Sequence, residues 1–275
     1  MGRWKIVQPV DWNLKTLNFA IRRFELTLWA PLRILRPLAN SMNTSVPIRR
    51  PLQNRNHWLC LLGLACLTPL AAFAADNRVK IDNDQVRVLA VTSAPDVKSA
   101  LHEHKMNRVM IYLDAGTITL TDSNGKTETL TFKAGEAMWS PAAGLHTSLN
   151  VSGHPVRIVE VELKSKSADS ASLKQSALDP VKVDPKRYHV EWENDQVRVL
   201  RAHYGPHDKG VIHEHILNRA VTFLTEGNMK ITNPDGTSKT VKTLLGDVTW
   251  GGPAKHIEEN LNDQPFEVMV VEFKQ

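Results

Sequence analysis

Short apolar runs rich in β-branched residues, separated by turn-forming residues, make up most of the chain beyond about residue 79. Polar and apolar residues alternate within several runs, which is typical of strands with one buried face. In the first half of this region the runs are Val86–Val91, Arg108–Leu113, Thr117–Thr121, Thr127–Phe132 and Val156–Leu163. The region contains no long helical period. The pattern predicts an all-β sandwich or barrel, and closure into a barrel would remove exposed strand edges.

Two dipeptides between apolar runs predict tight hairpins. Asn124-Gly125 separates two predicted strands, and Asp235-Gly236 occupies the corresponding place further along the chain. Both residues of such pairs tolerate positive φ, which favours two-residue hairpin turns. We therefore expect a two-residue turn at each place.

The whole pattern of runs occurs twice. The segment Asn83–Leu89 returns unchanged as Asn194–Leu200, 111 positions later. Solenoid repeats have periods of only about 20 to 50 residues, so this long period indicates two copies of a small domain. We place the copies at 79–164 and 188–275, joined by a linker at 165–187 that is rich in Ser, Ala, Lys and Asp.

The charge of the chain is unevenly distributed. The formal net charge is +5, yet residues 1–74 contain ten basic and two acidic residues, and the remainder contains 24 basic and 27 acidic residues. A nucleic-acid-binding protein needs a basic face on its folded part, so the sequence argues against nucleic acid as a partner. The basic leader instead indicates targeting.

Residues 42–74 have the layout of a secretory signal peptide. Arg49 and Arg50 precede the apolar run Trp58–Phe73, and Ala72–Ala74 forms a small-x-small cleavage pattern. The run is about 15 residues long, short of the roughly 20 that span a bilayer, so stable membrane insertion after cleavage is not expected. An uncleaved membrane anchor is the alternative. We expect the mature protein to be periplasmic or secreted.

Residues 1–41 precede this complete signal peptide. Met42 would be a natural start, so we interpret residues 1–41 as an extension from an over-long start assignment. A basic amphipathic helix on a membrane surface is the alternative. Both cysteines, Cys60 and Cys66, lie in the leader. The mature chain is therefore expected to contain no disulfide, cysteine nucleophile or thiolate metal site.

Histidine is the chemically informative residue that both copies share. His102 and His104 are two apart on a predicted strand, so their side chains share one face and Glu103 takes the other. His146 begins a later strand and could close a three-nitrogen site with them. The matched residues of the second copy are His213, Glu214, His215 and His256. Imidazole suits Zn, Cu, Fe and Ni. The histidines without a matched partner are interpreted as surface or packing residues: His154, His189, His203 and His207.

These motifs resemble those of the cupin superfamily. The first cupin motif has a His-x-His pair and a later glycine, here Gly116 and Gly227. The second motif is represented by Gly135, Pro141, Gly144, His146 and Asn150, and again by Gly246, Pro253, His256 and Asn260. The resemblance covers about 85–164 and 196–274. It implies a bicupin, with two tandem cupin-type β-barrels of the double-stranded β-helix or jelly-roll type.

The sequence departs from the cupin pattern at one metal ligand. The family's usual glutamate lies five residues after the second histidine, where this chain has Val109 and Ala220. Neither side chain can bind a metal, while Glu103 and Glu214 are expected to face away. The resemblance therefore implies three-histidine sites with open positions for a divalent ion, either Fe, Mn, Ni or Zn.

An Asn-Arg pair stands beside the missing ligand in both copies, as Asn107-Arg108 and Asn218-Arg219. The arginine could bind a substrate carboxylate through two hydrogen bonds, with the asparagine beside it. The alternative is a solvent-facing pair at a strand edge. No residue is assigned a catalytic role.

Two further matched positions carry large or charged side chains. Trp139 and Trp250 precede the third histidines, and we interpret them as core residues, with an aromatic pocket wall as the alternative. Glu162 and Glu272 belong to the last predicted strand of each copy and are expected on the surface.

The resemblance leaves two functions open. The first is a metal-dependent enzyme of oxidoreductase (dioxygenase), isomerase or decarboxylase type that acts on a small organic acid or sugar-like substrate. The second is a non-catalytic periplasmic protein that binds a small molecule. The histidines preserved in both copies favour the first, and the missing glutamate favours the second, because the fold by itself does not choose. Since a bicupin mimics a dimer within one chain, we expect a monomer or a homodimer.

Overall fold

The computed structural model describes residues 78–164 and 176–274. The predicted extension and signal peptide, both cysteines and most of the predicted linker lie outside these described residues. Among the residues described, no helix combines the length and the hydropathy needed to cross a bilayer.

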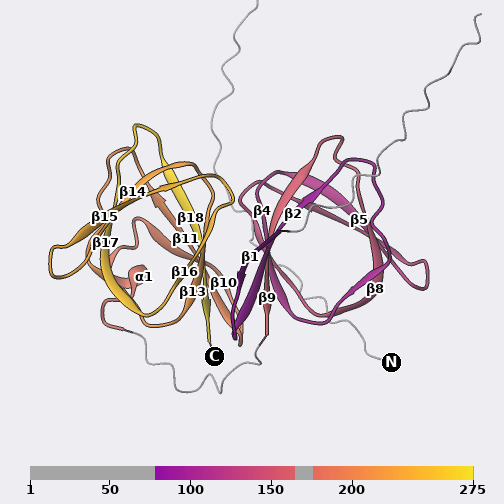
Figure 1. Cartoon of the computed structure of the whole chain (residues 1–275), viewed down its shortest axis with the longest axis horizontal. Coiled ribbons are helices and arrows are strands. Elements are labelled where there is room, and N and C mark those ends of the chain that lie inside the picture. The colour runs from indigo at the N-terminus through magenta and orange to yellow at the C-terminus, as the bar shows by residue number, and fades with distance from the viewer. Residues whose placement is uncertain (1–77, 165–175, 275) are drawn as a thin grey trace, which may run out of the picture. The chain divides into compact units, whose positions relative to one another are not determined.

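The first copy folds into two antiparallel sheets (Figure 1). One sheet has five strands in the order β1-β2-β9-β4-β7, and the other has four in the order β3-β8-β5-β6. The strands are β1 (Arg78–Asp82), β2 (Val86–Ser93), β3 (His102–His104), β4 (Arg108–Tyr112), β5 (Gly116–Asp122), β6 (Thr127–Phe132), β7 (Ala137–Ser140), β8 (Ala143–Asn150) and β9 (Val156–Leu163).

The second copy repeats this topology. Its sheets have the orders β10-β11-β18-β13-β16 and β12-β17-β14-β15, which are the orders of the first copy with each strand advanced by nine. The strands are β10 (Tyr188–Glu193), β11 (Val197–Tyr204), β12 (His213–His215), β13 (Arg219–Phe223), β14 (Gly227–Thr232), β15 (Ser238–Thr243), β16 (Val248–Gly251), β17 (Ala254–Asn260) and β18 (Phe266–Phe273). The predicted all-β fold of two tandem barrels is confirmed.

One short helix, α1 (Pro180–Val183), precedes the second barrel within the predicted linker. Asp179 caps it by accepting from the Val181 amide, and the same carboxylate forms an ion pair with Arg198 at 2.6 Å. The Leu178 carbonyl accepts from the Glu214 amide at 2.8 Å. The described end of the linker is therefore attached to the second barrel.

The two hairpins differ from the two-residue turns that the sequence predicts. The Asp122 amide donates to the Lys126 carbonyl, and the Gly125 amide donates to the Asp122 carbonyl, so three residues form the loop. Gly125 has φ +81°, and Gly236 has φ +84° in the matching loop of the second barrel. Asn124 does not adopt positive φ, because a three-residue hairpin loop places only its last residue in that region.

One hydrophobic core contains residues of both barrels. It includes Val88 and Val161 of the first barrel with Val199 and Val271 of the second, all fully buried. Each barrel also has its own internal hydrophobic cluster. The cluster of the first barrel contains Tyr112, and that of the second contains Tyr188. The five-stranded sheets are therefore buried on both faces.

Polar contacts between the barrels involve matched residues of the two copies. Asn107 Nδ2 donates to Gln196 Oε1 at 2.6 Å, and Asn218 Nδ2 donates to Gln85 Oε1 at 2.7 Å. Each contact is the other with the two copies exchanged, as in an interface with two-fold symmetry. The barrels thus contact each other as two protomers of a symmetric dimer would.

Candidate metal centres

The register of the four-stranded sheet brings the first three histidines together. His102 and His146 are direct partners on β3 and β8, and His104 lies two residues further along β3 on the same face. The centroid of the His102 ring is 5.0 Å from that of His104 and 4.5 Å from that of His146. Glu103 is exposed and pairs with Lys105, as the alternation of the strand predicts.

The second barrel forms an equivalent cluster. His213 and His256 are direct partners on β12 and β17. The centroid of the His213 ring is 5.2 Å from that of His215 and 4.6 Å from that of His256. In each barrel, one nitrogen from each histidine lies within 4.8 Å of the other two, which is the arrangement of a three-nitrogen metal site. The structure therefore unites all six histidines in two triads.

Backbone carbonyls orient the imidazoles. The Nδ1 atom of His102 lies 2.8 Å from the Ala100 carbonyl oxygen, and that of His213 lies 3.0 Å from the Val211 oxygen. A carbonyl only accepts, so Nδ1 carries the proton and Nε2 presents its lone pair. This is the tautomer that leaves Nε2 free to bind a metal.

Burial keeps the imidazoles of His104 and His213 neutral. Desolvation, with a further contribution from the charge of Arg108, lowers the pKa of His104 to about 3. Desolvation also lowers the pKa of His213 to about 4, although the Glu258 carboxylate opposes this shift. Neutral imidazole is the form that binds a metal, so these two histidines are ready to bind one at neutral pH.

Glu162 and Glu272 are not on the surface, contrary to the expectation from the sequence. Their exposed fractions are 7% and 3%. Glu272 Oε1 accepts from His215 Nδ1 at 2.7 Å, and Glu162 Oε1 lies 3.9 Å from His104 Nδ1. The strands β9 and β18 are central in their sheets and bury both faces, so the charged face turns toward the histidines. Glu272 orients His215 through this hydrogen bond, whereas Glu162 lies beside His104 without forming one.

The two arginines lie inside the barrels. Arg108 and Arg219 are each 7% exposed, so a solvent-facing position is wrong for both. Arg108 Nη1 donates to Glu160 Oε2 at 3.3 Å, and Arg219 Nη1 donates to the Gly252 carbonyl oxygen at 2.5 Å. Arg108 is also the strand partner of Glu162, so its guanidinium belongs to the environment of the first triad.

The asparagines take part in other contacts. Asn107 Nδ2 donates to the opposite barrel, and its Oδ1 accepts from the Ala142 amide at 2.9 Å. Asn218 makes the matching contact with Gln85. These contacts explain why both copies keep an asparagine at this position. The geometry gives no support to the interpretation that the asparagines bind substrate.

The tryptophans do not form the aromatic pocket wall that was the alternative interpretation. Trp139 packs against the shared core and lies with its ring centroid 6.2 Å from that of Trp192, a residue of the other barrel. Trp250 stacks on Phe273 at 5.5 Å but keeps 36% of its surface exposed. The interpretation as a core residue therefore agrees with Trp139 and is wrong for Trp250.

Each barrel has one further carboxylate that the other lacks. Glu160 in the first barrel corresponds to Val270 in the second, and Glu258 in the second corresponds to Ser148 in the first. Burial raises the pKa of Glu160 in spite of its Arg108 partner. Sequence comparison of the copies shows these differences, but only the structure shows that both carboxylates face the histidines.

None of the family models compared with the chain matches it. The β-alanine degradation protein BauB of Pseudomonas aeruginosa is 33% identical over 86 residues, which are 31% of this chain and 90% of that protein. The crystal structure of a cupin domain from Bordetella pertussis is 27% identical and covers 34% of this chain and 95% of that domain, with a TM-score of 0.32. The chain belongs to the cupin superfamily.

The crystal structure of AerE from Microcystis aeruginosa is similar to this bicupin over both barrels. That structure covers 74% of this chain and 100% of AerE, with 12% identity and a TM-score of 0.50. At this identity the likeness concerns the fold alone.

The bicupin's triads fit a divalent metal ion. His256 Nε2 is buried and makes no hydrogen bond, although a buried polar nitrogen without a partner is costly. A metal ion would satisfy this lone pair. Both sites consist of three imidazoles with carboxylates close by, which is a donor set that Zn, Fe and Mn all accept.

Proposed function

We propose that this bicupin is a metal-dependent enzyme that acts on a small organic acid in its first barrel. The observation that carries the proposal is the convergence of three imidazoles beside a buried guanidinium, that of Arg108. His102 and His104 keep part of their surface accessible, whereas His213 and His215 are 0% and 2% exposed. A small molecule can reach the first triad more easily.

The residues around the first triad have complementary roles in this proposal. Arg108 attracts an anionic substrate group, and its partner Glu160 has a raised pKa, so that carboxyl can hold a proton to deliver or accept. Glu162 adds a negative charge beside His104. A divalent ion held by the histidines would polarise a carboxylate or carbonyl oxygen of the substrate. Oxidoreductase, isomerase and decarboxylase chemistry are all compatible with this set.

The test is elemental analysis of the chain, purified without an affinity tag. We expect iron, manganese, nickel or zinc, and we expect His102→Ala with His104→Ala to remove the ion of the first barrel while that of the second stays. Thermal melting controls for folding. An unchanged metal content in the folded double variant would show that these histidines do not bind metal.

A non-catalytic binding protein is the second candidate, and the replacement of the family's glutamate by Val109 favours it. Under this alternative, small organic acids would raise the melting temperature of the metal-loaded protein without being converted. If the wild-type chain forms product and the double variant does not, the protein is an enzyme.

We also propose that the protein is exported to the periplasm or secreted. The support is the basic, apolar and small-residue order of residues 42–74. Fractionation of cells that produce the chain, with mass spectrometry of the mature N-terminus, tests this. Cleavage near Ala74 is expected, and an intact N-terminus in the cytoplasmic fraction would contradict it.

A further inference from the structure

We propose that Glu258 is a fourth metal ligand in the second barrel and replaces the glutamate that the family places at the position of Ala220. This inference rests on the proposed metal binding and goes further, because it assigns the two barrels different metal sites. The first barrel has Ser148 at the matching position and keeps three histidine ligands.

The strand β17 places Glu258 beside the histidines. Glu258 follows His256 by two residues, so both side chains lie on the same face. Its Oε1 lies 3.4 Å from His256 Nε2, and its Oε2 lies 4.0 Å from His213 Nε2. Two ligands that are each about 2.1 Å from one ion are separated by about 3.0 Å at a right angle and about 3.4 Å at a tetrahedral angle. The carboxylate is thus at ligand distance from the triad.

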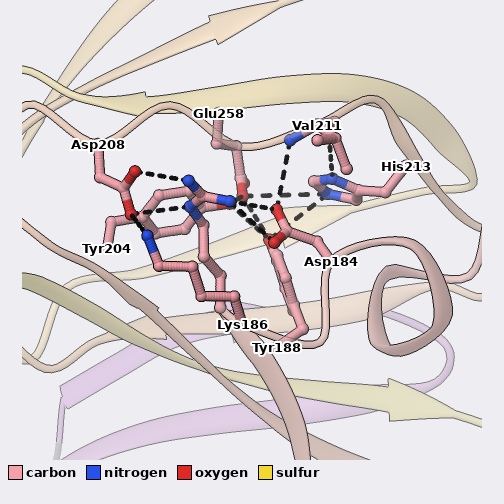
Figure 2. A network of polar contacts seen from close by, with 9 residues as sticks. Asp184, Lys186, Tyr188, Tyr204, Asp208, Val211, His213 and Glu258 are labelled. Atoms are coloured by element: carbon pink, nitrogen blue, oxygen red, sulfur yellow. Dashed lines mark hydrogen bonds and ion pairs between the residues drawn. The ribbon is translucent and has the colours of Figure 1, made fainter.

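Two tyrosines hold the carboxylate in place. The hydroxyls of Tyr188 and Tyr204 both donate to Glu258 Oε2, the latter at 2.8 Å (Figure 2). The Tyr188 hydroxyl also lies 3.4 Å from His213 Nε2. Because both hydroxyl donors are on Oε2, Oε1 is left to face His256. Hydrogen bonds of this kind orient a carboxylate ligand and are a common feature of metal sites.

The surroundings of Glu258 agree with this geometry. Its Oε1 lies toward His256, and its Oε2 lies toward His213 and the two tyrosine hydroxyls. The side chain of Glu258 also keeps 17% of its surface accessible, so it is not sealed from the interior of the site.

This difference predicts different metal affinities in the two barrels. A fourth, anionic ligand strengthens binding and leaves fewer open positions. The second barrel should therefore retain its ion more firmly, while the first barrel keeps positions open for substrate.

The test uses Co²⁺ titration of the full chain against a chromophoric chelator, with the visible absorption of bound Co²⁺ as a second readout. Glu258→Gln keeps the shape of the side chain and can still accept from the tyrosines, but it removes the charge. We expect the tighter site to weaken by roughly tenfold or more, since loss of a group that only orients a ligand already costs about 10- to 100-fold. The Co²⁺ absorption of that site should also change.

Two variants make the result decisive. Glu259→Gln is the matched control, because Glu259 is the next residue of β17 and pairs with Lys230 at 3.9 Å. It should leave both affinities unchanged. His213→Ala should abolish the tighter site and so assign it to the second barrel.

Unchanged affinity and absorption in Glu258→Gln, with the tighter site lost in His213→Ala, would overturn the fourth ligand and leave the three-histidine site. Absence of Co²⁺ binding in the wild-type chain would instead refute metal binding itself, and with it the proposed function. Circular dichroism establishes that each variant is folded before titration.

Discussion

At the scale of single residues, the environment of each histidine decides whether it can bind a metal. His102 and His213 donate through Nδ1 to a carbonyl two residues earlier, and His215 donates to the buried Glu272. In the metal-free protein these histidines thus present Nε2 lone pairs to the interior. Each Nε2 atom must stay unprotonated to bind a metal. Protons and metal ions compete for these atoms.

This competition predicts a pH-dependent stability of the metal-free protein. The pKa of His104 falls from 6.5 to about 3 on folding, and that of His213 falls to about 4. Between these limits the unfolded chain binds the protons and the folded chain does not, so the free energy of unfolding decreases as the pH falls below 6.5. The loss is on the order of 1 kcal/mol per pH unit for each such histidine.

Other groups modify but do not reverse this prediction. Burial also lowers the pKa of His146 and His215, whereas the raised pKa of Glu160 acts in the opposite direction. Four histidines outweigh the single carboxyl. Urea unfolding of the metal-free chain at pH 7.5, 6.0 and 5.0 measures the effect. A free energy of unfolding that stays constant over this range would disprove it.

At the scale of elements, close packing at the start of β5 depends on a missing side chain. A Cβ on Gly116 would lie 2.6 Å from Ser152 Oγ and 2.8 Å from Val156 Cγ2. Val156 is fully buried and cannot move easily, and Ser152 Oγ accepts from the Thr117 amide at 2.7 Å. The glycine of the first motif therefore serves packing between β5 and the loop before β9.

Gly116→Ala should accordingly lower the free energy of unfolding by about 1–3 kcal/mol, the usual cost of overpacking. The matched control is Gly144→Ala, because a Cβ there would meet nothing within 4 Å. Chemical denaturation of both variants compares them. Equal stabilities would mean that the region around Gly116 repacks without cost.

At the scale of the whole molecule, contacts at the junction of the barrels explain why the segment Asn83–Leu89 is repeated. In its first copy Asn83 Oδ1 accepts from the amide of Val86, Gln85 pairs with Asn218, and Val86 enters the shared core. The strand partner of Arg87 is Glu162, which faces the first triad. These four residues of the segment thus contact the turn, the opposite barrel or a strand that faces the metal site, and their counterparts in the second copy do the same.

The shared core predicts that the two barrels unfold together. Trp192 of the second barrel donates from Nε1 to the Ala137 carbonyl of the first at 2.7 Å and packs against the shared core. Trp192→Ala should therefore lower the stability of both barrels, by about 2 kcal/mol or more for a large side chain in a core. Calorimetry should show a single transition at a lower temperature.

Val190→Ala is the control for this prediction, because Val190 lies on the same strand, β10, with 38% of its surface exposed. Its melting temperature should stay near that of the wild type. Two separate transitions in the wild-type chain, or one barrel unaffected by Trp192→Ala, would show that the barrels are energetically independent.

The sequence by itself determined the duplication, the all-β fold and the histidine triads. The duplication is explicit in the repeated segments, and the two-residue period of a strand places His102 and His104 on one face whatever surrounds them. The family resemblance rested on the same residues and is supported by the relative from Pseudomonas aeruginosa.

Only the tertiary structure decided which face of a strand is the interior. Alternation in β9 separates Glu162 from Val161, but the sequence suggested that the charged face meets solvent. In the structure Val161 packs in the core shared by the barrels, so the charged face turns inward to the histidines. The position of Glu258 beside His256 follows from the same cause, because a local period defines faces and only the packing of whole sheets gives each face its partner.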